Sequence, residues 1–343
     1  MDPFQKRSLG ASGVMLPQIG FGAAPLGELF TKVSEQEAEA TLQGAWDEGI
    51  RYYDTAPWYG RGQSEHRVGR FLYRQERADV ILSTKIGRIL KAPARPERFD
   101  TGFWAGGLHF EHYFDYSYDG VMRAYEDSLQ RLGMNRIDLL LIHDLDVWHQ
   151  GSKGMVDAKL AQLANGGFRA LAELKDGGAI KAIGAGINEL GMIPRFVEMF
   201  DIDFFLMALK YTLGEQETLQ AELPLCVERD IGIVIGGVFN SGLYATGPVA
   251  GAKYNYADPT QAELDKAAKI KAVCERHRVP LIAAALQFPL LHPQVTCVIP
   301  GAFRPEQTRE NLAHVRREIP SDLWAELRHE GLIHADAPTA QQL

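Results

Sequence analysis

The sequence predicts an α/β fold, a single (β/α)8 TIM barrel with a short N-terminal hairpin and long loops at the carboxyl ends of its strands. Apolar segments of strand length alternate with helical patterns along the whole chain, as in α/β proteins with a parallel sheet. Eight such strand–helix pairs can be placed, which is the number that a barrel needs. A doubly wound sheet shows the same alternation and is the main rival.

The strand candidates are short apolar runs, several of them continuous in Ile, Leu and Val, as strands buried on both faces are. In chain order they are Gly20–Gly22, Arg51–Asp54, Val80–Thr84, Ile137–His143, Ala179–Gly186, Phe204–Leu209, Gly232–Ile235 and Thr296–Pro300. A segment before the first of them, Arg7–Met15, is expected to form a hairpin.

Capping signals mark where the helices between these strands begin. Ser34 with Glu37, and Thr260 with Glu263, have the spacing of a capping box, in which each residue satisfies a backbone N–H of the other. Ser117 precedes a further helical stripe and is expected to cap it. These signals place helices from about residue 35, from about residue 118 and from about residue 261.

Composition predicts one globular domain over residues 1–343, with a core of about 17–320. The net charge of −8 and the lack of a dense Lys/Arg run argue against a nucleic-acid partner. No apolar run is long enough for a membrane span, and no signal peptide is expected. The three scattered cysteines, Cys226, Cys274 and Cys297, favour a reducing compartment, so we expect a cytoplasmic protein. The oligomeric state stays open.

Three connections are too long for plain strand-to-helix turns: Ile86–Tyr116, Asp144–Gly167 and Gly237–Pro259. Long ordered loops in a compact domain are usually functional. In a barrel all three follow strands at the carboxyl-terminal face, where active sites are built.

Aromatic residues and histidines in these loops are candidates for a substrate wall. The first long connection contains Trp104, His109 and Tyr113, and Trp58 lies in an earlier loop. Local packing of a surface loop explains the same residues. We therefore keep both interpretations.

Four residues form a candidate catalytic set. Asp54 and His143 end two of the apolar strands, Lys85 directly follows another, and Tyr59 lies in the loop after Asp54. Taken alone, such an Asp is usually a helix cap, such a Lys is solvated and such a His is a core group. Because strand ends converge in a barrel, their joint placement favours one site.

The set suits proton transfer coupled to hydride transfer. A tyrosine hydroxyl has a pKa of about 10, and a nearby ammonium lowers it. Lys85 is expected to supply this charge, with Asp54 keeping the lysine protonated and in place. His143 is expected to donate a hydrogen bond to a substrate oxygen.

These motifs resemble the aldo-keto reductase superfamily. The resemblance rests on the Asp54–Tyr59 loop, on Ser83-Thr84-Lys85 and on Leu141-Ile142-His143, and it extends from Gly20 to Asn311. It implies a (β/α)8 barrel with NAD or NADP extended across its carboxyl-terminal face. It also implies that no metal is needed.

The resemblance implies roles at the nicotinamide end of the cofactor. Asn188 corresponds to the amide that holds the carboxamide, and Tyr211 corresponds to the ring that stacks on nicotinamide. Ile187 stands where the family has Ser, and Ala208 where it usually has Gln. Two contacts usual in the family are therefore in question.

Two later segments resemble those that bind the rest of the dinucleotide. The implied contacts are Asn240, Ser241, Gly242 and Leu243 for the pyrophosphate, and Gly301, Arg304, Gln307 and Asn311 for the adenosine. Basic residues that many members have at the positions of Gly301 and Gln307 are missing, which favours NAD slightly. Arg304 is an alternative cation for a 2′-phosphate.

Within the superfamily, four strings resemble one bacterial group, the D-threo-aldose 1-dehydrogenases (L-fucose dehydrogenases) and the pyridoxal 4-dehydrogenases. They are Gly22–Gly27, Phe114–Gly120, Leu209–Leu213 and Ile235–Gly242. The leading hypothesis is oxidation of the cyclic hemiacetal of an aldose to a lactone. The alternatives are oxidation of pyridoxal to 4-pyridoxolactone, general aldehyde or ketone reduction, a non-catalytic nucleotide-binding subunit, and a metal-dependent hydrolase.

Overall fold

The computed structural model describes residues 1–339. The chain forms two compact units. The first contains Met1–Ile19, Leu206–Pro300 and the described residues from Glu310 onward, and the second contains Gly20–Phe205 and Gly301–Arg309. Each unit is described by itself.

The second unit is built on parallel strands in the order β9-β8-β5-β4-β3. Successive neighbours pair in register, with Gly22 opposite Asp54, Asp54 opposite Ser83, and His143 opposite Gly186. The bounds are β3 Phe21–Gly22, β4 Tyr52–Asp54, β5 Ile81–Ile86, β8 Leu139–His143 and β9 Ala182–Ile187. Because parallel strands point the same way, their functional carboxyl ends share one edge.

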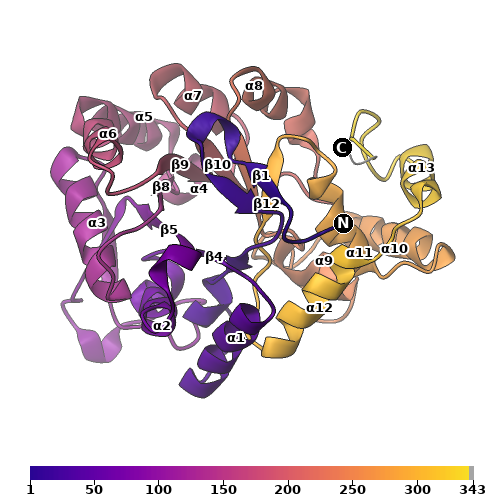
Figure 1. Ribbon diagram of the computed structural model, residues 1–343, viewed down its shortest axis with the longest axis horizontal. Helices are drawn as coiled ribbons and strands as arrows, with labels where there is room; N and C mark the ends of the chain where they lie inside the picture. The colour runs from indigo at the N-terminus through magenta and orange to yellow at the C-terminus, as the bar shows by residue number, and fades with distance from the viewer. Residues whose placement is uncertain (340–343) are drawn as a thin grey trace. The chain divides into compact units, whose positions relative to one another are not determined.

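Helices cover the outside of this sheet. Figure 1 shows α1, α2, α3 and α6 outside β4, β5 and β8. The helices are α1 Glu35–Asp47, α2 Gln63–Leu72, α3 Tyr118–Leu132, α4 Val147–Gln150, α5 Lys153–Gln162, α6 Phe168–Asp176 and α7 Met192–Met199. The predicted capping box of Ser34 with Glu37 is confirmed, and Ser117 accepts from the backbone N–H of Gly120 as expected.

The first long connection contains a hairpin that the sequence analysis did not predict. Its strands are β6 (Arg88–Lys91) and β7 (Glu111–Phe114), which pair antiparallel with Arg88 opposite Phe114. The hairpin holds an otherwise irregular segment beside the end of β5.

The first unit contains the remaining strands in the order β12-β11-β10. They are β10 Phe204–Ala208, which continues from the second unit, β11 Gly232–Gly236 and β12 Val295–Val298. The predicted N-terminal hairpin is confirmed as β1 (Lys6–Ser8) paired antiparallel with β2 (Met15–Pro17). All eight predicted barrel strands are therefore present.

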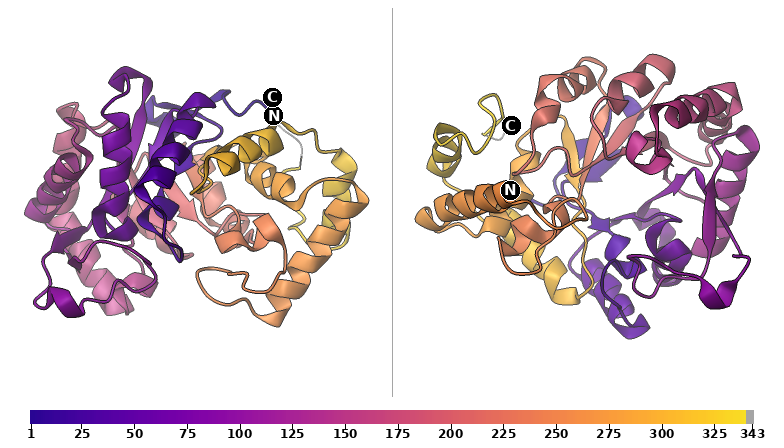
Figure 2. Two further views of the ribbon diagram at one scale, coloured as in Figure 1. Left: turned by 90° about the horizontal axis from the view of Figure 1, so that it is seen from below. Right: turned by 180° about the vertical axis from the view of Figure 1, so that it is seen from behind.

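Six helices belong wholly or partly to the first unit: α8 Glu222–Glu228, α9 Leu243–Thr246, α10 Gln261–Arg276, α11 Leu281–Leu290, α12 Pro305–Arg316 and α13 Ser321–His329. The predicted capping box of Thr260 with Glu263 starts α10. Helices α10 and α13 pack side by side (Figure 2). No helix among residues 1–339 is long and apolar enough to cross a membrane.

Single turns connect these elements. Those of 3-10 type are Gly10–Ser12, Ala24–Gly27, Tyr59–Gly62, Arg77–Asp79, Pro96–Arg98, Glu217–Gln220 and Asn240–Gly242, and Leu163–Gly167 is a π turn. The turn at Tyr59–Gly62 contains left-handed residues, with φ of 64° at Gly60 and 56° at Arg61. This geometry turns the chain sharply between Tyr59 and α2.

Candidate active site

Three neighbouring strands bring Asp54, Lys85 and His143 together. Asp54 ends β4 and His143 ends β8, while Lys85 lies one residue before the end of β5. The register places Asp54 opposite Ser83 and Lys85 opposite Leu141. The three side chains therefore gather at one edge of the second unit.

Lys85 forms a buried ion pair with Asp54. Its Nζ lies 2.9 and 2.8 Å from the two carboxylate oxygens and donates to the carbonyl of Thr55 at 2.7 Å. Ser83 Oγ donates to Asp54 Oδ1 at 2.7 Å. Lys85 Nζ also lies 4.7 Å from the centroid of the Tyr59 ring. The lysine is thus held between the carboxylate and the phenol, as the sequence predicts.

The environment of Tyr59 favours the protonated form of its hydroxyl. Burial raises the pKa of this hydroxyl well above the ordinary 10.0, Asp54 and Asp144 raise it further, and Arg88 opposes them. The expectation that Lys85 lowers this pKa is wrong. The main physical reason is burial, which the ammonium of Lys85 does not offset because Asp54, at 2.8 Å, partly neutralises its charge.

His143 is a neutral hydrogen-bonding group. Burial lowers the pKa of its imidazole well below 6.5, and Asp144 opposes the effect. Its ring lies 6.0 Å from that of Tyr59, nearly edge-on at 86°. The buried hydroxyl of Tyr116 donates to the carbonyl of His143 at 2.6 Å and fixes the end of β8. Tyr116 packs so closely on Gly87 that a Cβ there would lie 2.4 Å from its ring.

Aromatic side chains border this site. Trp58 lies in the middle of the group, with ring centroids 5.7 Å from Trp104 and 4.8 Å from His112. Trp104 lies 6.0 Å from Tyr59. The structure thus brings two of the sequence-predicted substrate residues, Trp58 and Trp104, beside Tyr59.

The other two predicted substrate residues lie elsewhere in the loop. His109 is exposed and packs against Phe99 at 6.1 Å, and Tyr113 is exposed on the β7 strand. His112, from the same predicted connection, contacts Trp58 instead, as does Arg88, which no sequence pattern indicated. The alternation along β7 is the signal that was available, since residues 112 and 113 point to opposite faces.

Comparison with known proteins agrees with this geometry. A sequence profile described as the Aldo/keto reductase family matches residues 18–329. The chain belongs to the aldo/keto reductase family. It is therefore an oxidoreductase, and its fold class is the (β/α)8 barrel, as the sequence predicts.

Several similar proteins match nearly the whole chain. A pyridoxal 4-dehydrogenase of Microbacterium luteolum is 42% identical over 96% of this chain and 98% of its own. A D-threo-aldose 1-dehydrogenase of a Pseudomonas species is 40% identical over 94% of this chain and 96% of its own. A solved aldo-keto reductase of Bacillus halodurans, in its holo form, superposes with a TM-score of 0.75 at 25% identity, covering 97% of this chain and 98% of that one.

Proteins of the aldo/keto reductase family use NAD(P). Of the residues predicted to bind its nicotinamide end, one lies in each unit. In the second unit, Asn188 Nδ2 donates to Asp144 Oδ1 at 3.0 Å, so its amide nitrogen is already engaged. In the first unit, Tyr211 is fully buried, 5.5 Å from both Phe288 and His292, and its hydroxyl has no partner. The burial of the Tyr211 ring differs from the expectation, because a ring that stacks on nicotinamide must have an exposed face.

The predicted pyrophosphate segment is a left-handed turn at the start of α9. The φ angles of Asn240, Ser241 and Gly242 are 45°, 61° and 107°. The Asn240 side chain is buried and bonded to Thr212 Oγ1 at 2.6 Å, and Leu243 is buried as well. These two side chains hold the turn. The backbone N–H groups of Asn240 and Gly242 donate to the carbonyls of Gly237 and Phe239 at 2.8 and 3.0 Å, and Ser241 Oγ accepts from the N–H of Tyr256 at 2.9 Å, so these groups already have partners.

The predicted adenosine segment is a helix start. Gln307 Oε1 accepts from the backbone N–H groups of Phe303 and Arg304 at 2.9 and 3.2 Å, so this side chain serves as a cap of α12. Arg304 is exposed, with its guanidinium 5.4 Å from the Phe303 ring centroid. A Cβ at Gly301 would lie 2.6 Å from Pro25 Cγ. Asn311 is buried in the first unit.

One group within residues 1–339 brings three metal-type ligand atoms within 4.8 Å of one another: Asp144, Asp146 and His149. Arg88 pairs with Asp144, and His149 Nδ1 lies 2.7 Å from Asp146 Oδ1. Basic side chains thus occupy the positions that a cation would take, and we assign the group no metal. That the protein works without a metal stays a prediction.

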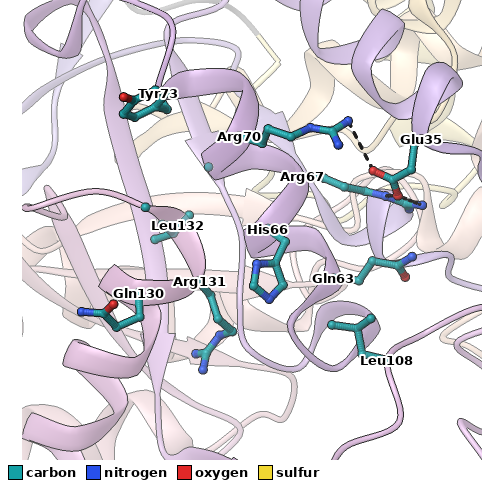
Figure 3. Close-up of a pocket in the computed structure, with 12 residues that line it drawn as sticks. Glu35, Gln63, His66, Arg67, Arg70, Tyr73, Leu108, Gln130, Arg131 and Leu132 are labelled. Carbon is teal, nitrogen blue, oxygen red and sulfur yellow. Dashed lines mark hydrogen bonds and ion pairs between the residues drawn. The ribbon is translucent and has the colours of Figure 1, made fainter.

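A hollow of about 520 Å³ lies among α1, α2 and α3 of the second unit (Figure 3). Its cationic side chains are already paired. Arg67 and Arg70 lie 2.7 and 3.4 Å from Glu35, and Arg131 lies 2.5 Å from Glu65. An anion would have to displace these carboxylates, so we assign the hollow no function.

Proposed function

We propose that this aldo/keto reductase oxidises the cyclic hemiacetal of an aldose, of the L-fucose or D-threo-aldose type, to a lactone. The observation that carries the proposal is the placement of Tyr59, whose ring lies 4.7 Å from Lys85 Nζ and 6.0 Å from His143. A proton-transfer group and a hydrogen-bond donor thus face the same space. The similarity to a D-threo-aldose 1-dehydrogenase supports the choice of substrate.

In this reaction Tyr59 acts as the general base. It takes the proton of the anomeric hydroxyl while the C1–H bond breaks, and the C1–O bond becomes the lactone carbonyl. Bound NAD(P) supplies the acceptor for the departing hydride. His143 orients the substrate oxygen with a hydrogen bond, and Lys85, held by Asp54, stabilises the phenolate form of Tyr59 that accepts the proton. In the reducing direction Tyr59 returns the same proton as an acid.

The chain's residues fit a dinucleotide in part. Thr308 Oγ1, at the start of α12, and Tyr211 Oη are buried without a hydrogen-bond partner, and a bound ligand is a common reason for such atoms. We propose that the dinucleotide is held by Asn188, the Asn240–Leu243 turn, Gly301, Arg304, Gln307 and Asn311, with Tyr211 taking part through its hydroxyl because Phe288 and His292 cover its ring. Within that set, Asn188 uses one of the two N–H groups of its amide to bind Asp144.

We favour NAD over NADP. Pro25 fills the space that a side chain at Gly301 would need, and Gln307 is engaged as a cap. Neither position offers a cation for a 2′-phosphate. Arg304 is exposed and is the residue through which NADP would bind.

Pyridoxal is the second candidate substrate. The wall formed by Trp58 and Trp104 beside Tyr59 suits a flat aromatic ring, and a pyridoxal 4-dehydrogenase is among the similar proteins. Pyridoxal also forms a cyclic hemiacetal, so Tyr59 and His143 would act on it in the same way. General aldehyde or ketone reduction is the reverse reaction, in which Tyr59 gives its proton to the carbonyl oxygen and the reduced nucleotide, when bound, supplies the hydride.

The test is turnover by the purified protein with L-fucose, D-arabinose, L-galactose and pyridoxal, each with NAD and with NADP, followed at the nicotinamide absorbance. We expect reduction of NAD with at least one of the sugars and loss of that activity in Tyr59→Phe. Turnover with pyridoxal alone would replace the sugar assignment. Nucleotide binding without any turnover in either direction would favour a regulatory subunit.

Further predictions accompany this function. We expect a single-domain enzyme in the cytoplasm that acts on a small molecule and has no nucleic-acid partner. All three cysteines are buried, and Cys226 and Cys274 are free thiols, which suits a reducing compartment. Metal analysis of the purified protein tests the expectation that none is needed.

A further inference from the structure

Arg88 is a buried cation beside the active site. It opens the β6 strand two residues after β5 ends, and it is only 4% exposed. The centre of its guanidinium lies 4.6 Å from the ring centroids of both Trp58 and Phe114. Two aromatic faces therefore hold the group in place. A charge in such surroundings needs a counter-charge.

Asp144 supplies that counter-charge. It forms a close ion pair with Arg88 Nη1, and Asn188 Nδ2 donates to its other oxygen at 3.0 Å. The residue directly follows His143 and has a φ of 52°, a left-handed conformation that is uncommon outside glycine. Burial raises the pKa of the Asp144 carboxyl, but His143 and Arg88 bring it below its usual range. The pair is therefore charged at neutral pH.

The same Arg88 nitrogen reaches the imidazole of His143. Nη1 lies 3.5 Å from His143 Nδ1. Because a guanidinium can only donate hydrogen bonds, the ring nitrogen that faces it must be the one without a proton. A neutral imidazole then carries its proton on Nε2.

Asp144 competes for that proton. Its Oδ1 lies 3.4 Å from His143 Nε2, so an unpaired Asp144 carboxylate would attract the Nε2–H group or stabilise an imidazolium. Arg88 opposes both effects. Its guanidinium neutralises the Asp144 carboxylate, and it repels the positive charge of an imidazolium at His143. The charged and titratable groups that face His143 are Tyr59, Lys85, Arg88, Asp144 and His149.

We propose that Arg88, fixed by Asp144, is the positioning residue that keeps His143 as the neutral Nε2–H form and leaves its proton free for a substrate oxygen. The inference rests on the proposed function, in which His143 donates that hydrogen bond. The inference also gives a role to the hairpin formed by β6 and β7, because this hairpin places Arg88 beside His143 at the end of β8.

The test compares Arg88→Gln with wild type by 15N NMR of the histidine side chains, with His143 assigned by the signals lost in His143→Gln. In wild type we expect a neutral ring protonated at Nε2 from about pH 6 to pH 8, that is, around and above the ordinary histidine pKa. In Arg88→Gln we expect His143 to take up a second proton at higher pH than in wild type. We also expect kcat to fall about 10–100-fold, as it does when the partner of a functional group is removed, with little change in the KM for NAD.

Arg61→Gln is the matched control. The Arg61 guanidinium also lies against the Trp58 ring, at 4.9 Å, but it donates to the carbonyl of Phe110 and not to His143. We expect this variant to leave the His143 signals unchanged. Arg88→Lys keeps a cation beside Asp144, and we expect it to hold His143 neutral and recover part of kcat.

The NMR result decides the inference even if no substrate is turned over, which separates its failure from that of the proposed function. Unchanged tautomer and ionisation of His143 in folded Arg88→Gln would overturn it. If Arg88→Gln does not fold, Arg88→Lys is the deciding variant. A loss of kcat in Arg88→Lys as large as that of His143→Gln, with the His143 signals unchanged, would also overturn it.

Discussion

Lys85 Nζ lies 2.8 Å from Asp54 Oδ2, and both side chains are almost completely buried. Two opposite charges at this distance form a nearly neutral unit, so the ammonium beside the Tyr59 ring does not offset the burial that raises the pKa of the tyrosine. The pair therefore acts less as a fixed positive charge than as a support whose effect appears when negative charge develops on the phenol.

The buried pair of Lys85 and Asp54 predicts a large difference in the free energy of unfolding between a single and a double variant. In Lys85→Met the Asp54 carboxylate stays buried without its partner, and we expect a loss of about 3–5 kcal/mol in the free energy of unfolding. Adding Asp54→Asn removes the unpaired charge and should recover most of that loss. Urea denaturation measures both values. Equal stabilities of the single and the double variant would contradict the buried ion pair.

The raised pKa of Tyr59 predicts that oxidation and reduction depend on pH in different ways. Oxidation needs the phenolate, and the raised pKa keeps this form scarce. We therefore expect kcat/KM for the sugar to rise about tenfold per pH unit over the alkaline range. Reduction uses the protonated phenol and should stay flat over the same range. The pH profile of each direction, measured at saturating nucleotide, checks this, and a flat oxidation profile would show that the base is already ionised.

A second buried carboxylate allows a stability prediction away from the site. Glu65 is fully buried and accepts from Thr84 Oγ1 at 2.6 Å and from Arg131 Nε at 2.5 Å. Arg131→Met removes its only cationic partner among the described residues, and we expect a loss of about 3–5 kcal/mol.

The exposed pair Arg123–Asp127, at 3.5 Å, is the control for this prediction. Arg123→Gln should cost no more than about 0.5 kcal/mol, as exposed pairs usually do. Chemical denaturation of both variants gives the comparison. Losses of equal size would mean that burial of Glu65 contributes nothing beyond a surface contact.

The strands and the candidate catalytic residues could be predicted from sequence because their signals are local. A buried parallel strand such as Leu139–His143 is an apolar run. Asp54, Lys85 and His143 lie at or near the ends of such runs, and Tyr59 lies in the turn that follows the first of them. Capping boxes are local as well, and the one at Ser34 is present as expected.

The supporting residues could not be predicted, because their contacts join distant segments. Arg88 reaches Asp144 across 56 positions in the chain, and Asn188 reaches the same carboxylate across 44. Nothing near Arg88 in the sequence indicates that it is buried. The pKa of Tyr59 could not be predicted for the same reason, since it depends mainly on how deeply the hydroxyl is buried and then on the nearby carboxylates of Asp54 and Asp144, which no sequence pattern reports.

Gly301 provides a last prediction, which joins packing to nucleotide choice. A Cβ at this position would lie 2.6 Å from Pro25 Cγ and 2.9 Å from Pro25 Cδ, and a proline ring cannot move aside as a flexible side chain does. We expect Gly301→Ala to cost about 1–3 kcal/mol, as overpacking does. Gly154→Ala is the control, because the space around that helical glycine in α5 is open and alanine should stabilise the helix by about 0.5–1 kcal/mol. Thermal unfolding of both variants measures the difference. If Gly301→Ala were as stable as wild type, Pro25 would not block a larger side chain, and a cation grafted there by Gly301→Lys should then improve the KM for NADP.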